Sequence, residues 1–215
     1  MSLQATLAAI KQPGLSCAYK FISVGDEDAL LPNEAKLFEK SVISVRRQSG
    51  AARIAARWLL AEFGYASAEI LRGPSFGPIW PPGIVGSLAH DAEMAVAVVG
   101  DRNRFACVGI DIEPDLPLPP EIMHLVTTES ERQRLPRRLL ESRLVFVMKE
   151  AVYKAVNTLD RFSFDFQDIE VDPFENQALV SNGRRVRIAF AMDCWVIALA
   201  YLETEDGAAS PALRP

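Results

Sequence analysis

The heptapeptide "VGIDIEP" at residues 108–114 sets two acids, Asp111 and Glu113, two positions apart in an apolar run that ends at a proline. Side chains two apart on a strand share one face, so the acids should point together while the apolar residues between them face a core. Their mutual repulsion requires a nearby cation, because a carboxylate drawn out of water is costly unless it is paired. The alternative is an exposed strand whose acids are simply solvated.

The chain as a whole has the composition of a globular protein. Its 215 residues are 49% apolar, enough for one large domain or two small ones with a sizeable core. A net charge of −5 with a pI near 5.2 argues against general nucleic-acid binding, which requires a basic surface. We therefore expect no nucleic-acid partner, and any phosphate site must be local.

The cysteines and the hydropathy pattern indicate a reducing compartment and no membrane association. The three cysteines are odd in number and widely spaced, so neither a disulfide framework nor a thiolate metal site is predicted. The N-terminal residues do not resemble a signal peptide, and no segment approaches 18 uninterrupted apolar residues. We expect a cytoplasmic, monomeric protein with no membrane partner.

Two long helices are predicted, over residues 46–64 and 141–157. The first has apolar residues at helical spacing and ends at a glycine, and the second is apolar almost all round. Their apolar faces comprise Ile54, Trp58, Leu59 and Phe63 in the first helix and Val145, Met148, Val152 and Ala155 in the second.

Strands are predicted beside each helix. Residues 94–99 form an apolar run, and "RRVRIAF" and "CWVIALAYL" near the C-terminus read as a pair of strands, preceded by "FDFQDIEVDP". The proline-rich stretch 114–121 breaks the chain after the strand with the two acids. The element order predicts an α+β fold of two similar lobes in a pseudo-twofold arrangement, each a small antiparallel sheet with a long helix. The predicted domains are 1–107 and 108–215, with the active site in the cleft between them.

The second helix supplies a third acid. Glu150 lies one turn before Lys154, so both side chains project from the same side of the helix. An ordinary solvated ion pair is the alternative, worth only a few tenths of a kcal/mol. Three carboxylates without histidine or thiolate form a hard oxygen site that suits Mg²⁺ or Mn²⁺ bound together with substrate phosphates.

Candidate phosphate ligands lie in the N-terminal half. Ser87 and His90 occur in "GSLAH" after a glycine, and Arg46 and Arg53 belong to the first predicted helix. A lone histidine is more often a core or surface group than a ligand, and arginines on a helix face are more often solvated. These alternatives stay open from the residues alone.

Three blocks in this order resemble the 4′-phosphopantetheinyl transferases. They are "WPPGIVGSLAH" (80–90), "VGIDIEP" (108–114) and "FVMKEAVYKA" (146–155), at about the spacing of that family. Within the family the chain is similar to the branch that serves siderophore and surfactin synthetases. Phe146, where the surfactin type usually has tryptophan, is similar to the enterobactin synthetase component D type.

The resemblance implies a magnesium-dependent reaction with coenzyme A as donor and a serine of an acyl, peptidyl or aryl carrier protein as acceptor, releasing adenosine 3′,5′-bisphosphate. It implies that Asp111, Glu113 and Glu150 hold the metal against the pyrophosphate. Glu150 or a metal-held water would remove the serine proton, and Lys154 would stabilise phosphate charge. The residues implied to contact coenzyme A are Arg46, Arg53, Ser87, His90 and Lys154.

Two rival functions remain compatible with the same residues. Three acids and a lysine could direct water at a phosphate, which is the chemistry of a metal-dependent phosphodiesterase. An inactive family member that serves as a binding partner is the other rival, although the intact acids and Lys154 argue against it.

A charged segment at residues 129–143 is the candidate carrier-docking surface. It contains five arginines, directly precedes the second long helix, and could meet an acidic carrier through Arg137 and Arg138. A solvated, partly self-paired face is the equally weighted alternative.

Overall fold

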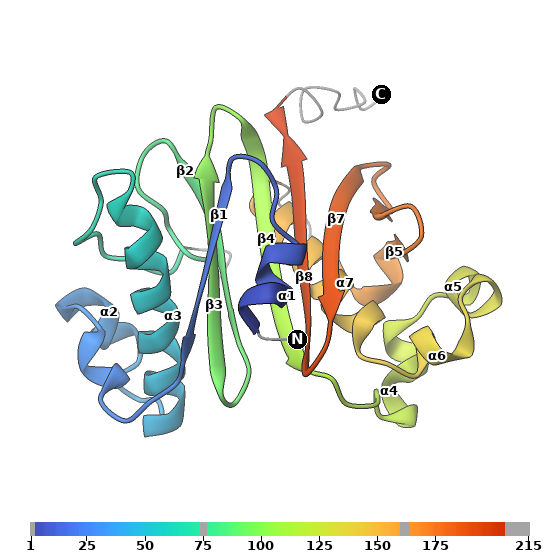
Figure 1. Ribbon diagram of the computed structural model, residues 1–215, viewed down its shortest axis with the longest axis horizontal. Coiled ribbons are helices and arrows are strands. Elements are labelled where there is room, and N and C mark those ends of the chain that lie inside the picture. Colours follow the sequence, from blue (N-terminus) through green and yellow to red (C-terminus); the bar gives the residue numbers. More distant parts are fainter. Residues whose placement is uncertain (1–2, 74–76, 160–163, 205–215) are drawn as a thin grey trace.

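Two antiparallel sheets lie side by side in the protein, and each is packed against one long helix (Figure 1). The computed structural model describes residues 3–73, 77–159 and 164–204. One sheet has the strand order β1-β3-β2 and the other β4-β8-β7-β6-β5. The predicted α+β class with antiparallel sheets is confirmed, whereas the pseudo-twofold relation between the halves stays a prediction.

The three-stranded sheet carries the N-terminal part of the chain. All its neighbouring strands run antiparallel, and residues 94–99, predicted as a strand, form its central member. A short 3-10 helix and a short α-helix connect β1 to the long helix α3. The elements are β1 (Leu15–Phe21), η1 (Asp26–Ala29), α2 (Pro32–Leu37), α3 (Ile43–Ala61), β2 (Ile84–His90) and β3 (Met94–Asp101).

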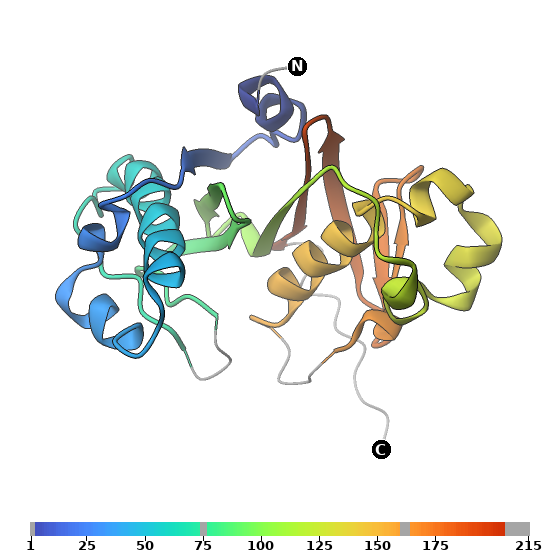
Figure 2. The ribbon, with the colours of Figure 1, turned by 90° about the horizontal axis from the view of Figure 1, so that it is seen from below.

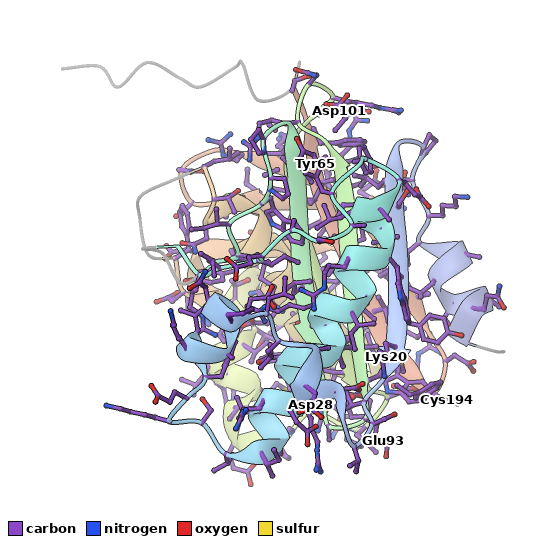
Figure 3. All side chains as sticks on the ribbon, turned by 90° about the vertical axis from the view of Figure 1, so that its left-hand side faces the viewer. Lys20, Asp28, Tyr65, Glu93, Asp101 and Cys194 are labelled. Carbon is purple, nitrogen blue, oxygen red and sulfur yellow. The ribbon has the colours of Figure 1, made fainter. Side chains whose placement is uncertain are left out.

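The helix α3 runs along the three-stranded sheet, as Figure 3 shows. Lys20, Asp28 and Glu93 lie toward the end of the sheet where α3 begins, and Tyr65 and Asp101 lie toward the other end, where α3 stops. The helix therefore runs in the same direction as β3.

The predicted helix at 46–64 exists, but its predicted apolar face was only partly right: Leu59 is buried in the core, whereas two other members of that face are not. Trp58 is 54% exposed and Phe63 is also exposed, so neither belongs to the core. A Cβ on Gly50 would lie 1.9 Å from the carbonyl oxygen of Asp26, so close packing of α3 requires small residues. Small residues give a weak hydrophobic stripe, which explains the error. The buried small residues are Ser49, Gly50, Ala51, Ala52, Ala55 and Ala56.

The five-stranded sheet carries the C-terminal part of the chain. The predicted pairing of the last two strands is confirmed, since β7 and β8 are hydrogen-bonded neighbours. The predicted helix at 141–157 is also confirmed, and its four predicted apolar residues are fully buried against this sheet. The elements are β4 (Phe105–Pro114), α7 (Leu144–Val156), η2 (Phe166–Asp168), β5 (Ile169–Asp172), β6 (Gln177–Val180), β7 (Arg185–Met192) and β8 (Trp195–Glu203).

Short helices complete the fold. The N-terminal helix α1 (Leu3–Ala9) packs on β7 and β8, on the face of the sheet opposite α7 (Figure 2). The predicted domain division at residue 107 stays a prediction. The N-terminal helix α1 lies on the C-terminal sheet, so the first residues of the chain pack outside the predicted N-terminal domain. Three further helices, α4 (Pro120–Val126), α5 (Glu129–Arg134) and α6 (Arg137–Leu140), connect β4 to α7. In the described ranges, every helix is too short or too polar to cross a bilayer.

Glycine at position 109 allows α7 to lie directly on β4. A Cβ added there would fall 2.0 Å from the carbonyl oxygen of Ala151 and 2.6 Å from the amide nitrogen of Ala155. Both contacts are backbone atoms of α7, so no side-chain rotation could relieve them. The strand with the two acids and the helix with Glu150 are therefore held at backbone contact.

Replacing Gly109 by valine should force α7 away from β4 and lower the free energy of unfolding by about 1–3 kcal/mol or more, as overpacking does. Urea denaturation measures this loss. Gly73→Ala is the control, because a Cβ there meets its neighbours at an ordinary 3.5 Å. Equal stability of the two variants would show that the contact at Gly109 does not constrain the packing.

Candidate functional site

The two acids of β4 project toward α7, as their spacing predicts. They share the strand face of Gly109, whereas the alternating Val108, Ile110 and Ile112 are buried in the core on the other face. Asp111 is only 7% exposed and Glu113 is partly buried. The alternative of an exposed strand whose acids are simply solvated is therefore wrong for Asp111.

Lys154 provides the cation that Asp111 requires. Its Nζ lies 2.6 Å from Asp111 Oδ1 and also donates to the carbonyl oxygen of Ile110 at 3.3 Å. The ammonium thus bridges from α7 to β4 instead of decorating the surface of its own helix. The second carboxylate oxygen of Asp111 is buried and has no hydrogen-bond partner among the described residues. A buried acceptor without a donor is costly, and it marks a position open to a ligand.

Arg143 is a site residue that the sequence interpretation placed only in the docking segment. It directly precedes α7 and forms an ion pair with Glu113. Its Nε is buried and unpartnered within the described structure. The available signal was its position one residue before the helix that carries Glu150, which brings its side chain to the same end of β4.

The three carboxylates of Asp111, Glu113 and Glu150 all have raised pKa values. Burial raises the pKa of Asp111, an effect that the Lys154 charge opposes. Burial likewise raises the pKa of Glu113, against the opposing charge of Arg143. Burial also raises the pKa of Glu150, and the negative charges of Asp111 and Glu113 add to that increase. The three acids therefore repel one another in a partly desolvated place where additional positive charge is stabilising.

His90 is the residue of the three-stranded sheet that lies near this cluster. It is the last residue of β2, and β2 packs against β4. Partial burial lowers the pKa of the His90 imidazole, which also senses Lys154 and Asp111, although the residue as a whole remains exposed. The next residue, Asp91, accepts a 2.7 Å hydrogen bond from Trp195 Nε1 at the start of β8. This bond joins the two sheets beside the cluster.

Other predicted phosphate ligands lie elsewhere. Ser87 is 4% exposed on β2, so its side chain offers almost no accessible surface for a coenzyme A contact. Arg53 is buried: it donates to the carbonyl oxygens of Ile70 and Ser49 and lies 3.5 Å from Glu34. Burial lowers the pKa of its guanidinium to about 10. The direct contacts of Ser87 and Arg53 with coenzyme A stay predictions, and both would require these buried side chains to become accessible.

Arg46 remains a candidate. It is half-buried on α3, and its Nε is enclosed without a hydrogen-bond partner in the described part of the chain. An unsatisfied buried donor of this kind suits a phosphate oxygen. Its contact with coenzyme A stays a prediction.

The acidic residues fit a divalent cation in their chemistry, although they are not yet gathered around one. No three acidic, histidine or cysteine side chains of the described residues are grouped tightly enough to hold a metal as they stand. Lys154 and Arg143 pair with the carboxylates of Asp111 and Glu113. The unpartnered Asp111 oxygen and the mutual repulsion with Glu150 still favour a hard cation. The metal site stays a prediction that requires these side chains to rearrange.

The predicted docking arginines lie on the surface of α6. The Arg137 side chain is 88% exposed and pairs with Glu141 at 2.5 Å, and Arg138 is exposed. Other arginines of the charged segment are committed to acids within it or on β5, namely Arg132 to Glu129 and Arg134 to Glu170 and Asp172. Of the charged face, the two arginines of α6 are thus the more available to a partner.

Comparisons with known proteins agree on one family. Residues 33–100 match "4'-phosphopantetheinyl transferase N-terminal domain", and residues 107–200 match "4'-phosphopantetheinyl transferase superfamily". The chain is 38% identical over 160 residues to 4'-phosphopantetheinyl transferase PptT of Mycobacterium tuberculosis, covering 73% of this chain and 70% of the relative. It is 42% identical over 127 residues to 4'-phosphopantetheinyl transferase Npt of Nocardia iowensis, covering 58% of this chain and 57% of the relative.

A further relative is named as a component of enterobactin synthase. Enterobactin synthase component D of Salmonella typhimurium is 38% identical over 111 residues, which cover 49% of this chain and 45% of the relative. The matched region thus spans between 45% and 70% of the length of these relatives.

Replacing Glu150 by glutamine should stabilise the metal-free protein at neutral pH by about 0.5–2 kcal/mol, because a repelled charge is removed. The folded pKa of Glu150 is raised, so the wild type pays for its ionisation only as pH rises above the unfolded value of 4.5. The advantage of the variant should therefore vanish at lower pH and grow toward neutrality.

Denaturant unfolding in a chelating buffer across pH 4–7 measures this difference. Glu39→Gln, at an exposed position, is the control and should show no such growth with pH. A Glu150→Gln variant less stable than the wild type at pH 7 would contradict the described repulsion.

Proposed function

Because the chain belongs to the 4′-phosphopantetheinyl transferase family, we propose that it transfers the phosphopantetheine arm of coenzyme A to a serine of an apo carrier protein. The supporting observation is the cluster of Asp111, Glu113, Glu150 and Lys154 at the contact of β4 and α7. The His90 end of β2 lies beside it. One chain contributes every part of this cluster, so we expect it to act as a monomer.

Lys154 and His90 are suited to hold the pyrophosphate and phosphate groups of coenzyme A. The Lys154 side chain is 29% exposed, so its ammonium is reachable from solvent while one edge contacts Asp111. Phosphoryl transfer depends mainly on alignment and on neutralising oxygen charge, and a fixed lysine does both. Mg²⁺, or Mn²⁺ in its place, would be held by Asp111, Glu113 and Glu150 and would add positive charge at the phosphate oxygens.

Glu150 is suited to accept the proton of the attacking serine. Its raised pKa brings it closer to the pH at which it operates, so it binds a proton more readily than an ordinary glutamate. The serine oxygen forms a bond to the phosphorus of the pantetheine arm. The bond from that phosphorus to the bisphosphate oxygen breaks, and adenosine 3′,5′-bisphosphate leaves.

Intact-mass measurement of candidate apo carriers, mixed with the protein, coenzyme A and Mg²⁺, tests the proposal directly. We expect each true acceptor to gain one phosphopantetheine arm. Glu150→Gln should abolish this gain while the protein stays folded, because the serine proton then has no acceptor. The exposed control Glu39→Gln should transfer at the wild-type rate.

The same mixture separates the rival functions. Bisphosphate release from coenzyme A in the absence of carrier would identify a phosphodiesterase. Absence of any Mg²⁺-dependent coenzyme A binding would identify a protein that serves only as a binding partner. Undiminished turnover by Glu150→Gln would remove that residue from the mechanism.

We further propose that the two arginines of α6 dock the carrier, because they are exposed and carrier proteins are typically acidic. Replacing Arg137 and Arg138 by glutamate should raise the KM for carrier far more than the KM for coenzyme A. Steady-state kinetics with each substrate varied in turn measures both constants.

Arg102→Glu combined with Arg185→Glu is the charge-matched control, at exposed positions away from α6. Equal increases in the two KM values for the α6 variant, or the same carrier effect in the control, would count against docking at α6.

A further inference from the structure

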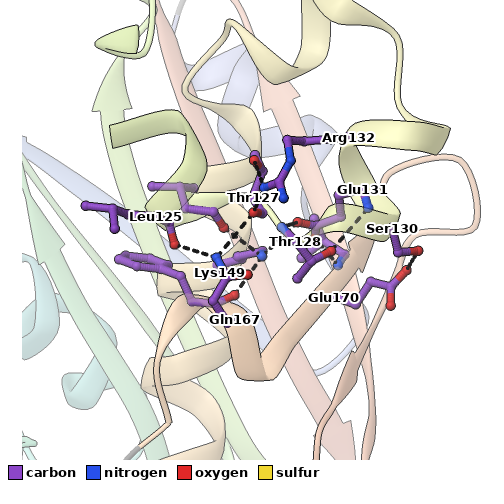
Figure 4. Close-up of polar contacts among 12 residues, drawn as sticks. Leu125, Thr127, Thr128, Ser130, Glu131, Arg132, Lys149, Gln167 and Glu170 are labelled. Atoms are coloured by element: carbon purple, nitrogen blue, oxygen red, sulfur yellow. Dashed lines mark hydrogen bonds and ion pairs between the residues drawn. The ribbon is translucent and has the colours of Figure 1, made fainter. Parts of the chain in front are cut away.

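Lys149, the neighbour of Glu150 on α7, is fully buried and belongs to a polar network of its own (Figure 4). Its Nζ lies 2.8 Å from Glu131 Oε2 and donates to the carbonyl oxygens of Val126 at 2.8 Å and Phe166 at 2.7 Å. A lysine ammonium has three protons to donate, so these contacts satisfy it completely.

Glu131 is satisfied as completely as its partner. Its carboxylate accepts from the amide of Thr128 at 2.8 Å and from the amide of Val171, on β5, at 2.7 Å. The ion pair therefore connects α7, the start of α5 and β5. A buried ion pair adds little net stability compared with well-packed apolar residues, because desolvation offsets the attraction. What this pair does contribute is a fixed arrangement of the segments that it joins.

Gln167 holds the same segment from a second side. The two protons of its amide nitrogen are shared among the carbonyl oxygens of residues 124, 125 and 127, at N···O distances of 3.2, 2.8 and 3.2 Å, and Lys149 donates to the carbonyl oxygen of residue 126. The last carbonyls of a helix have no partner within the helix. Two side chains from distant parts of the chain thus donate to four consecutive carbonyls at the end of α4. Figure 4 shows Lys149 and Gln167 beside Leu125 and Thr127.

The helices of this region are too short to hold a fixed position without tertiary contacts. We call residues 120–140 the α4–α6 arm; its three helices have 7, 6 and 4 residues. Isolated helices of this length are unstable in water, so the place of the arm depends on its tertiary contacts. Arg137 and Arg138 lie on the last helix of the arm. Their position relative to Glu150 therefore depends on the anchor, together with the buried Val126, Leu135 and Leu140 of the arm.

We propose that Lys149 and Gln167 are positioning residues, which fix the α4–α6 arm to α7 so that a carrier docked on the arm presents its serine to Glu150. This inference rests on the proposed transferase function and on docking at α6. Lys149 and Glu150 are adjacent in sequence but have different roles. Lys149 would fix the arm on which the carrier docks, and Glu150 would accept the proton of the carrier's serine.

Gln167→Ala is the main test, because Gln167 is exposed and its loss buries no charge. It should raise the KM for carrier by about two- to tenfold, the factor that corresponds to the net worth of one hydrogen bond, and leave the KM for coenzyme A unchanged. Hydrogen–deuterium exchange should become faster in the α4–α6 arm and stay unchanged in β4 and β8. Lys149→Met should show the same pattern more strongly, provided that it folds.

Gln133→Ala is the matched control, since Gln133 lies on the arm and, among the described residues, its side chain bonds to Glu129 of its own helix and to no other segment. It should change neither KM nor the exchange rates. Unchanged carrier KM in Gln167→Ala, or an equal rise in both KM values, would overturn the positioning role. If Lys149→Met does not fold, Gln167→Ala decides alone.

The exchange measurement keeps this inference separate from the function on which it rests. A wild-type protein that modifies no carrier would overturn the proposed function and the carrier part of the inference with it. Exchange in Gln167→Ala would then still judge the anchor itself: faster exchange in the α4–α6 arm supports it, and unchanged exchange refutes it.

Discussion

The backbone contact between β4 and α7 is the constraint on which the rest of the site depends. With no side chain at Gly109, the strand and the helix approach until a Cβ would lie 2.0 Å from a helix carbonyl. That approach lets Lys154 reach Asp111 and places Glu150 where the charges of both β4 acids raise its pKa. A wider separation would leave three ordinary surface carboxylates. The chemistry of the site is thus a consequence of packing.

The charges at this contact are paired, but among the described residues not every buried polar atom has a hydrogen-bond partner. Each acid of β4 has one basic partner, Lys154 or Arg143, yet one oxygen of Asp111 remains buried without a donor. Such an arrangement lowers the stability of the free protein. Binding of a cation or a phosphate-bearing substrate would offset that loss. On the other side of α7, Lys149 and Glu131 are fully satisfied. The helix therefore has one completed polar side, which holds structure, and one incomplete side, which is available for chemistry.

The sequence predicted the parts of this site that depend on local periodicity. The alternation in 108–114 placed two acids on one strand face, and the spacing of Glu150 and Lys154 placed both on one side of a helix. That the strand and the helix meet was implied only by the family resemblance. The α+β class and both long helices also follow from the pattern. The apolar face of α3 was only partly predicted, because most of its buried residues are glycine and alanine, which carry little hydrophobic signal.

Long-range contacts explain what the sequence could not predict. The burial of Arg53 depends on the carbonyl oxygen of Ile70 and on Glu34, both distant along the chain. Arg143 resembles the other arginines of its segment until β4 brings Glu113 to it. The anchor of the α4–α6 arm likewise depends on Gln167, a polar residue in no recognisable motif. Tertiary partners decide the role of a charged side chain, and its type alone does not.

The central claim is that Asp111, Glu113 and Glu150 bind one divalent ion where β4 meets α7. Electron paramagnetic resonance of Mn²⁺, titrated with the protein in the presence of coenzyme A, measures that binding without requiring turnover. The account predicts one bound ion in the wild type and loss of that ion in Asp111→Asn. An ion bound with unchanged affinity by Asp111→Asn, or no bound ion in the wild type, would contradict it.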